Sequence, residues 1–566
     1  MMQRDRFALG AVLLLALAAT VTSIGHDFTF DDIYVVRNNV RVHSLGGIRA
    51  LFGQTYWPPQ LGGDGYRPLV MTLFTLQWVA GNGAPWVFHA GNIVLALAVA
   101  AAVHWCARAV LPPAGAWVAA ALFAVHPVHV EVTGNVVGQS ELLVALFLSL
   151  AVGHYIRVRR QGMPGWRDSA VILTLFALGL LSKEHAIVLP ALLLAAELTV
   201  IPDPAWRTDA RAWRHARLLA LAFALVATVY LYVRSIVQTN LTGFVSFPVF
   251  QYIKMDAVDR VGMMMTEVPR IAQLLVFPVR LSGDYSPAEV TIPDGLAAVE
   301  LPGFFLCAGL VALAIALRRR SPVASLGLGW LMLSYLPVSN LLVVTGFITA
   351  ERTLFFPSVG VVLVAGAAFE WLRARERPVH RRAAIAAVGV LLVLGTARSI
   401  DRQRVWKNND VFFDQLVLDQ PNGYRAHFLR GRQVGGAHGR LQETEAEYRR
   451  ALRIFPYDLS MTLVIASDYH RGGLCAPAVS LLKWSYAVKE DITDGRFQYV
   501  ECLGKLGRWS EARQAALDGL RFVDARQSRG LRRLLAGADS ALGRRQWKRT
   551  MPLPESGKAQ GVSRIP

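Results

Sequence analysis

Eleven apolar segments of helix length dominate the first 400 residues, and they restrict this chain to an all-α, membrane-embedded fold. Hydrophobic residues make up 54% of the 566 residues and charged residues only 17%, against about 25% charged residues in soluble proteins. A bilayer core requires about 20 apolar residues per helix, and backbone groups in lipid must satisfy one another. The expected spans are residues 7–24, 87–109, 115–126, 139–156, 169–182, 185–200, 216–234, 302–318, 323–344, 353–372 and 382–399.

Basic residues set the expected orientation of these spans. The net charge of +19 is concentrated in short joints such as "RVRR" (157–160), "RRR" (318–320) and "RARERPVHRR" (373–382). This distribution is typical of cytoplasmic loops of membrane proteins and argues against nucleic-acid binding. Since no small-x-small cleavage site follows the first apolar run, we expect a retained helix with its N-terminus inside. The outer side then carries loops 25–86 and 235–301, the short outer joints and the C-terminal part.

After residue 400 the composition becomes that of a soluble region, and a repeat appears. Gly439, Gly473 and Gly507 are spaced 34 residues apart, the period of tetratricopeptide repeats. We therefore expect a membrane domain over 1–400, a linker over 401–420, a tetratricopeptide-like α-solenoid over 421–547 and a disordered tail over 548–566. An unrelated helical bundle is the alternative for the repeat region.

The four cysteines fall into two classes. Cys106 and Cys307 lie in apolar spans, where we expect them to be packing residues. Cys475 and Cys502 lie 27 residues apart in the C-terminal part, and they can pair if that part faces an oxidising compartment.

The polar clusters all fall in the expected outer segments. They are "FDDIYVVRNN" (30–39), "GYRPL" (65–69), "HPVHVEV" (126–132), "SKEH" (182–185), "GDYSP" (283–287) and "TAERTLF" (349–355). Each has a structural explanation on its own, such as a helix cap, an interfacial cation or an ion pair at a turn. Their convergence on one membrane face instead favours an active site, because a carboxylate can serve as general base while Arg and Lys hold a phosphate.

These motifs, with the repeats behind them, resemble the TMTC group of transmembrane and tetratricopeptide-repeat O-mannosyltransferases and their bacterial relatives, within the GT-C glycosyltransferase superfamily. The resemblance covers nearly the whole chain, with "LFAVHPVHVEVTGNVVGQSELL", "LLSKEHAIVLPALLL" and "AERTLFFPSVG" in the expected order. It implies a GT-C fold that transfers a sugar, mannose in this family, from a polyprenyl-phosphate donor to Ser or Thr of a protein. An envelope glycan stays open as acceptor.

The resemblance and the chemistry together nominate the site residues. We expect Asp31, Asp32 and Glu131 to be catalytic, and Arg67, Lys183 and Arg352 to bind the donor phosphate. The sugar or acceptor pocket is expected to contain Tyr66, His126, His129, Glu184, His185, Asp284, Tyr285 and Glu351. No cofactor is firmly implied, and a divalent cation bridging Asp32 and Glu131 stays open.

Two features leave alternatives open. Gln139 stands in "VGQSE" where relatives commonly carry Arg, and the repeat array is short, so the sugar and the acceptor are not settled by the motifs. A flippase or transporter of a lipid-linked saccharide would need charges near the bilayer midplane. A membrane-anchored repeat scaffold would tolerate loss of all the clustered acids. The composition, rich in Ala, Arg and Leu, favours a bacterial inner membrane with the site and the repeats on the periplasmic side.

Overall fold

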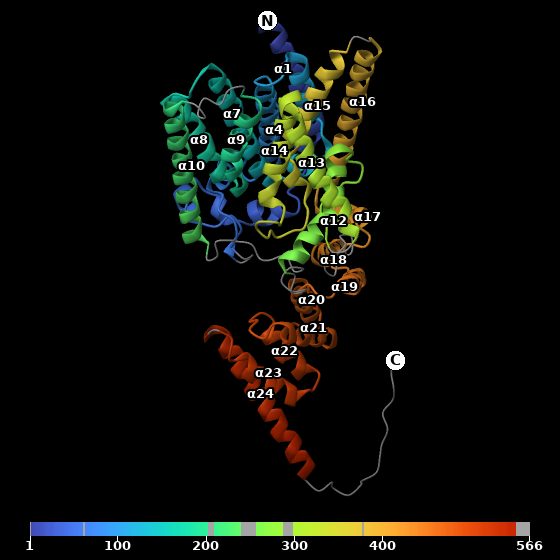
Figure 1. Cartoon of the computed structure of the whole chain (residues 1–566). Helices are drawn as coiled ribbons and strands as arrows, with labels where there is room; N and C mark the ends of the chain where they lie inside the picture. Colours follow the sequence, from blue (N-terminus) through green and yellow to red (C-terminus); the bar gives the residue numbers. More distant parts are fainter. Residues whose placement is uncertain are drawn as a thin grey trace. The chain divides into compact units, whose positions relative to one another are not determined.

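The chain folds into helices joined by short turns, as seen in a computed structural model that describes residues 2–59, 63–201, 209–238, 256–286, 298–375, 378–523 and 525–550. Within these ranges the extended pairing consists of one isolated bridge between Tyr285 and Thr349. The chain divides into two compact units, residues 1–455 and 456–566, coloured along the sequence in Figure 1. The all-α class predicted from the sequence is confirmed.

Six helices in the described ranges are long and apolar enough to cross a membrane. These are α1 (Met2–Thr20, extended to Gly25 by the 3-10 turn η1), α4 (Pro85–Ala107), α7 (Gln139–Gln161), α10 (Ala210–Val237), α13 (Leu301–Arg320) and α16 (Pro378–Gln403). A seventh span is available if α5 (Pro113–Ala124) and the segment Pro127–Gly134, bent by 48°, count as one. A multi-pass membrane protein is therefore confirmed.

The other expected spans are helical but shorter than a bilayer requires. They correspond to α8 (Trp166–Ser182), α9 (Leu189–Thr199), α14 (Pro322–Tyr335) and α15 (Ser358–Arg373). The apolar runs that predicted longer spans continue into the tight turns η8 (Glu184–Val188), η11 (Leu336–Val338) and η12 (Glu351–Leu354). Hydropathy does not separate such turns from helix, although η8 and η12 carry polar motifs.

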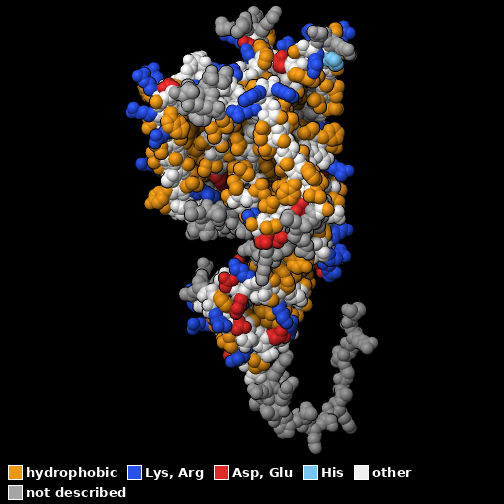
Figure 2. Space-filling view, in the orientation of Figure 1, with side chains coloured by type: hydrophobic (Ala, Val, Ile, Leu, Met, Phe, Trp, Pro, Cys, Tyr) orange, Lys and Arg blue, Asp and Glu red, His pale blue; other side chains and the backbone are white. Residues whose placement is uncertain are grey.

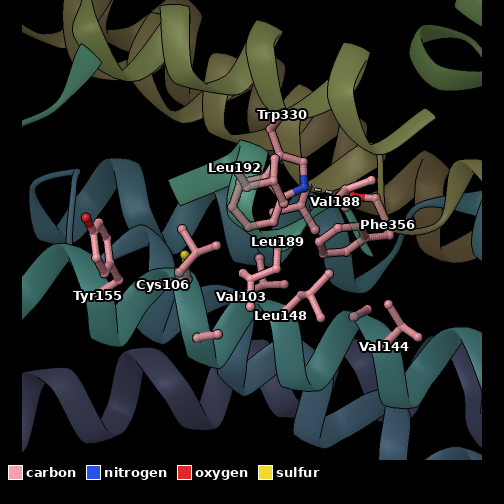
Figure 3. Packing of buried hydrophobic residues seen from close by; sticks show 14 of the residues in the cluster. Val103, Cys106, Val144, Leu148, Tyr155, Val188, Leu189, Leu192, Trp330 and Phe356 are labelled. Atoms are coloured by element: carbon pink, nitrogen blue, oxygen red, sulfur yellow. Dashed lines mark hydrogen bonds between the residues drawn. The ribbon is translucent and has the colours of Figure 1, made fainter. Parts of the chain in front are cut away.

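The core of the first unit lies between α4, α7, α9, α14 and α15. Trp330 of α14 is fully buried and donates its indole N–H to the carbonyl of Phe356 at 3.2 Å. Figure 3 shows both residues packed against Leu189 and Leu192 of α9, with Val103 and Leu148 beneath them. The turn that precedes α15 is therefore fixed by a buried hydrogen bond, which positions the neighbouring "ERTLF" segment.

Helices α14 and α15 cross at two glycines. A Cβ added to Gly360 would lie 2.2 Å from the carbonyl oxygen of Gly327, a contact that no side-chain rotation can relieve. We expect Gly360→Val to destabilise the protein by at least about 1–3 kcal/mol, because backbones must separate to admit it. Gly389→Ala in α16, where a Cβ meets no atom within 4 Å, is the control. Thermal unfolding in detergent measures both, and equal unfolding temperatures would contradict this contact.

The outward faces of the long helices are hydrophobic. Figure 2 shows a broad apolar surface on the visible side of the helical bundle, with Lys and Arg gathered at the end where α1 begins. Large exposed hydrophobic side chains include Phe305 and Ile315 of α13 and Val393 and Leu394 of α16. Such continuous apolar surface on helices is suited to lipid rather than water.

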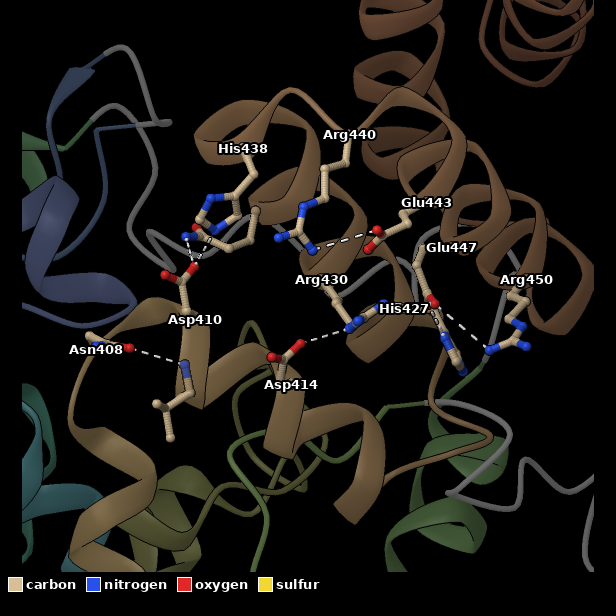
Figure 4. A network of polar contacts seen from close by, with 12 residues as sticks. Asn408, Asp410, Asp414, His427, Arg430, His438, Arg440, Glu443, Glu447 and Arg450 are labelled. Carbon is tan, nitrogen blue, oxygen red and sulfur yellow. Dashed lines mark hydrogen bonds and ion pairs between the residues drawn. The ribbon is translucent and has the colours of Figure 1, made fainter.

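Two other helices, α3 and α12, also belong to this unit. Helix α3 (Pro68–Gly81) is apolar but only 14 residues long, and α12 (Ala257–Val276) contains Pro269. Three further helices follow α16, namely α17 (Asn409–Asp419), α18 (Tyr424–His438) and α19 (Leu441–Ile454). Figure 4 shows polar contacts that join them, including Asp414 with Arg430.

The second unit consists of α20 (Leu459–Arg471), α21 (Cys475–Val488), α22 (Arg496–Lys505), α23 (Trp509–Gly519) and α24 (Ala525–Thr550). Gly473 and Gly507 have positive φ at turns between consecutive helices, and Gly439 has the same conformation at the end of α18. The 34-residue glycine period therefore coincides with helix ends, consistent with tetratricopeptide-like repeats. Cys475 and Cys502 form a disulfide that joins α21 to α22. Of the predicted disordered tail over 548–566, residues 548–550 belong to α24 and residues 551–566 lie outside the described residues.

Candidate functional site

A cavity of about 610 Å³ opens among the turns that join helices of the first unit. Its walls come from sequence-distant segments, since residues of the first loop, of η8, of η12 and of α18 all line it. Seven of the residues nominated from the sequence face it: Asp31, Arg67, Lys183, Glu184, His185, Asp284 and Arg352. The predicted convergence of the motifs on one location therefore holds for this half of the set.

Asp31 and Asp32 have different environments although they are adjacent. Asp31 lines the cavity and is only partly buried. Asp32 is fully buried and accepts hydrogen bonds from the backbone N–H groups of Val136 (3.1 Å), Val137 (2.9 Å) and Thr29 (3.3 Å). The carboxylate of Asp32 therefore fastens the first loop to η7 (Val136–Gly138), whereas that of Asp31 is directed toward the cavity.

Burial governs the electrostatics of this pair. Desolvation raises the pKa of Asp31, although the nearby Arg352 guanidinium opposes the change. Desolvation raises the pKa of Asp32 to about 7, partly offset by its three backbone N–H donors. A carboxylate with a raised pKa is a stronger base than a solvated one, and Asp31 combines that property with access to the cavity.

Arg352 is held in the cavity wall by Glu131. The two oxygens of Glu131 accept from the backbone N–H (2.7 Å) and from Nη1 (2.5 Å) of Arg352. The guanidinium also lies over the Phe347 ring at 4.9 Å. Glu131 itself is buried, 3% exposed, and is not among the residues that line the cavity. Its link to the cavity therefore runs through Arg352.

The other two nominated cations are paired in the same way. Arg67 contacts Glu184 through Nε (3.3 Å) and Nη2 (3.4 Å) and lies over the Tyr56 ring at 4.6 Å. Burial would raise the pKa of Glu184, but the positive charges of Arg67, Arg234 and Lys183 together outweigh it and lower that pKa to about 2. Lys183 forms an ion pair with Glu141, which also lies 3.4 Å from His185. Each cation is thus oriented by a carboxylate before any ligand arrives.

The remaining nominated residues lie behind the cavity wall. His126 bonds the carbonyl of Leu275 at 2.9 Å, and His129 bonds Ser358 at 2.8 Å while packing against Phe123 and Phe355. Tyr285 donates to Glu351 at 2.7 Å, and Tyr66 donates to the carbonyl of Phe52. These side chains tie the motifs to one another, and the structure does not bring them to the cavity surface.

The cavity also contains charged residues that the sequence motifs did not nominate. These are Asp64, Glu141, Arg234 and Arg425, with the aromatic residues Tyr56, Trp57 and Phe347. Asp64 stands two residues before the nominated Tyr66, and Glu141 follows the nominated "HPVHVEV" region, so widening both motifs would have found them. Arg234 and Arg425 have no local signal, because an isolated Arg in a long helix and one in the repeat region look like ordinary surface residues.

The sequence leaves open a divalent cation that bridges Asp32 and Glu131. Within the described ranges no cluster of three or more His, Cys, Asp or Glu side chains has a geometry suited to a metal. The nominated pair offers poor ligands as placed, since the oxygens of Asp32 are engaged by backbone N–H groups and those of Glu131 by Arg352. We therefore derive no step through a metal ion.

Comparison with known proteins finds relatives that are named protein O-mannosyl-transferases. No protein-family model matches the chain. The mouse protein O-mannosyl-transferase TMTC4 is 27% identical over 485 residues, covering 76% of this chain and 64% of the mouse protein. The chain is similar to the TMTC protein O-mannosyl-transferases. The human TMTC1 and TMTC3 enzymes are 25% and 23% identical, covering 79% and 76% of this chain.

The alignments with these TMTC relatives are partial. They cover 55% of human TMTC1 and 48% of human TMTC3, so the chain spans about half to two thirds of the curated relatives it matches. Solved structures with lower similarity include the archaeal oligosaccharyltransferase AglB from Archaeoglobus fulgidus in complex with an inhibitory peptide and a dolichol-phosphate (14% identity, 75% of this chain, 59% of that chain, TM-score 0.44). ArnT from Cupriavidus metallidurans bound to undecaprenyl phosphate also matches (12%, 90% and 79%, TM-score 0.38).

Proposed function

We propose that this protein is an inverting GT-C glycosyltransferase. It transfers a hexose, which we take to be mannose, from a polyprenyl-phosphate donor to a hydroxyl of a protein or an envelope glycan. The observation that carries the proposal is the cavity in which the carboxylate of Asp31 faces the cations Arg67, Lys183 and Arg352, beside helices that suit a membrane. The similarity to enzymes named protein O-mannosyl-transferases supports mannose and a protein acceptor.

The chemistry requires one base and a stabilised leaving group. Asp31 takes the proton of the acceptor hydroxyl as its oxygen attacks the anomeric carbon of the sugar. The bond between that carbon and the phosphate oxygen breaks, and the lipid phosphate leaves with the electron pair. Attack from the face opposite the phosphate inverts the anomeric configuration.

The paired cations Arg67 and Arg352 stabilise the negative charge of the leaving phosphate. Arg67 and Arg352 each use only part of their five N–H donors on Glu184 and Glu131, so further donors remain for phosphate oxygens. Because these carboxylates fix their positions, little reorganisation is needed as charge develops on the departing phosphate. Glu131, Glu141 and Glu184 serve as positioning residues in this scheme.

Two observations support an outer-face location for the site. The Cys475–Cys502 disulfide favours an oxidising compartment for the second unit. The Arg-rich ends of α7, α13 and α15 belong on the cytoplasmic side by the positive-inside rule. Together they support a site on the non-cytoplasmic face, which is the periplasmic face in the bacterial inner membrane expected from the composition.

The deciding experiment is transfer of radiolabelled mannose from polyprenyl-phosphate-mannose by purified protein in nanodiscs, supplied with envelope extract as acceptor. We expect label in protein or glycan with the native chain and with Asp401→Asn, a change at an exposed carboxylate of α16, but not with Asp31→Asn. Failure of the folded native protein with mannose and with other lipid-phosphate hexoses would overturn the proposal in favour of the transporter or the scaffold.

The proposed base predicts a particular pH dependence. Because burial raises the pKa of Asp31, the base is protonated and inactive at pH values where an exposed Asp, with a pKa near 3.8, would be ionised. We expect kcat/KM to rise with pH along an acid limb whose midpoint lies above 3.8. Rates measured between pH 4 and 8 at subsaturating donor test this, and a flat profile across that range would argue against an Asp base.

A further inference from the structure

Residues 406–409, which follow the long helix α16, are hydrogen-bonded to the loop that carries Asp31. Three hydrogen bonds join them: Asp27 N–H to the carbonyl of Lys407 (2.9 Å), Thr29 Oγ1–H to that of Trp406 (3.1 Å), and Phe30 N–H to Asn409 Oδ1 (2.7 Å). The loop that places Asp31 is therefore held from residues 406–409.

Phe30 shows how firmly this loop is held. Its φ of +55° lies in the left-handed region, which costs a bulky residue about 1 kcal/mol or more. The ring stacks on Phe412 of α17 at 5.2 Å, and Phe412 is almost fully buried. The packing of α17 thus offsets an unfavourable backbone conformation immediately before Asp31.

Helix α18 then brings a charge to the same cavity. Arg425, in its first turn, lines the cavity, and its Nε lies 3.4 Å from Oδ1 of Asp284. The turn around Asp284 is itself pressed against α17, since a Cβ on Gly283 would lie 2.5 Å from the Phe412 ring. Helix α18 is fixed in place by α17 and α19, because Arg430 contacts Asp414 at 2.9 Å and Glu447 at 3.0 Å (Figure 4).

We propose that Arg425 is a positioning residue of the catalytic cavity, held on Asp284 beside Asp31, so that α17 and α18 complete the active site. The inference rests on the proposed role of Asp31 as base. It means that α17 and α18 contribute to the catalytic cavity itself, in addition to any recruitment of acceptors by the repeats.

The charges around Asp31 make this role measurable. Those that act on its carboxyl are Arg352, Glu131, Arg425, Arg67 and the adjacent Asp32. The positive charge of Arg425 lowers the pKa of Asp31 and so opposes the effect of burial. Removing this cation should raise that pKa, while removing the partner Asp284 leaves the cation in the cavity and should not.

The test compares Arg425→Gln, Arg425→Lys and Asp284→Asn with Arg432→Gln, a change at an exposed arginine of the same helix. Carbodiimide labels protonated carboxyls, so labelling of the Asp31 peptide against pH, followed by mass spectrometry in nanodiscs, gives its titration midpoint without any need for activity. We expect Arg425→Gln to move the midpoint upward by about one pH unit, Arg425→Lys to restore most of the difference, and Arg432→Gln and Asp284→Asn to give no upward shift.

The acid limb of the transfer rate should move in the same direction for Arg425→Gln. An unchanged labelling midpoint in folded Arg425→Gln would overturn the inference. If Arg425→Gln does not fold, Arg425→Lys decides. A native labelling midpoint of Asp31 with a lowered kcat/KM in Arg425→Lys supports the inference. Native kinetics with an altered labelling midpoint overturns the inference. If the native protein transfers no sugar, the proposed function fails, but the labelling still decides whether Arg425 acts on Asp31.

Discussion

Replacing Asp31 by Asn is expected to lower kcat by about two to four orders of magnitude, the usual contribution of a general base. Asn has nearly the same size and hydrogen-bonding reach, but it cannot accept the proton of the acceptor hydroxyl. Because Asp31 lines the cavity and is only partly buried, the unfolding temperature should change little. Single-turnover transfer from the lipid donor, with thermal unfolding measured beside it, checks both parts.

Asp32→Asn is the matched control one residue away, and its expected outcome is the reverse. Its carboxylate accepts hydrogen bonds from three backbone N–H groups, and an amide can accept with one oxygen only, so at least one of these hydrogen bonds is lost. The cost is about 1–3 kcal/mol of stability, with residual activity in whatever protein remains folded. If Asp32→Asn were stable and inactive while Asp31→Asn retained turnover, the assignment of the base would be wrong.

Asp31 and Asp32 also show how much of the candidate site could be predicted from the sequence. The "FDD" motif located the loop that reaches the cavity, but both side chains are equal candidates for the base until the fold places the N–H groups of Val136 and Val137 beside one of them. That information is tertiary, since it joins residues more than a hundred positions apart. His129 is a similar case, because its bond to Ser358 and its aromatic neighbours are set by packing between α5 and α15.

The membrane class and the helical repeat region were predictable because periodicity and hydropathy are local properties. The number of membrane spans was less predictable, because the short polar turns η8 and η12 interrupt apolar runs. Arg425 lay beyond prediction, because nothing near it in the chain indicates that α18 reaches the cavity.

Glu131→Gln is the second change with a large expected effect. The substitution removes the charge that fixes Arg352 while keeping the size of the side chain, and it weakens a charged hydrogen bond at a residue only 3% exposed. We expect a loss of about 1.5–3 kcal/mol of stability, the usual value for hydrogen bonds to charged groups. Transfer should fall at least about tenfold, because the freed guanidinium is attracted to Asp31, with which it already interacts.

The direction of the pH effect separates this mechanism from general damage. A guanidinium drawn closer to Asp31 lowers the pKa of that carboxyl, so the acid limb of kcat/KM should move to lower pH in Glu131→Gln, opposite to its expected movement in Arg425→Gln. Glu370→Gln is the control, since Glu370 also pairs with an arginine and accepts a backbone N–H from Gly115, but it is not among the cavity-lining residues. It should lose stability and keep the native acid limb. An acid limb that stays in place, or moves upward, in Glu131→Gln would show that Glu131 does not act by holding Arg352 away from the base.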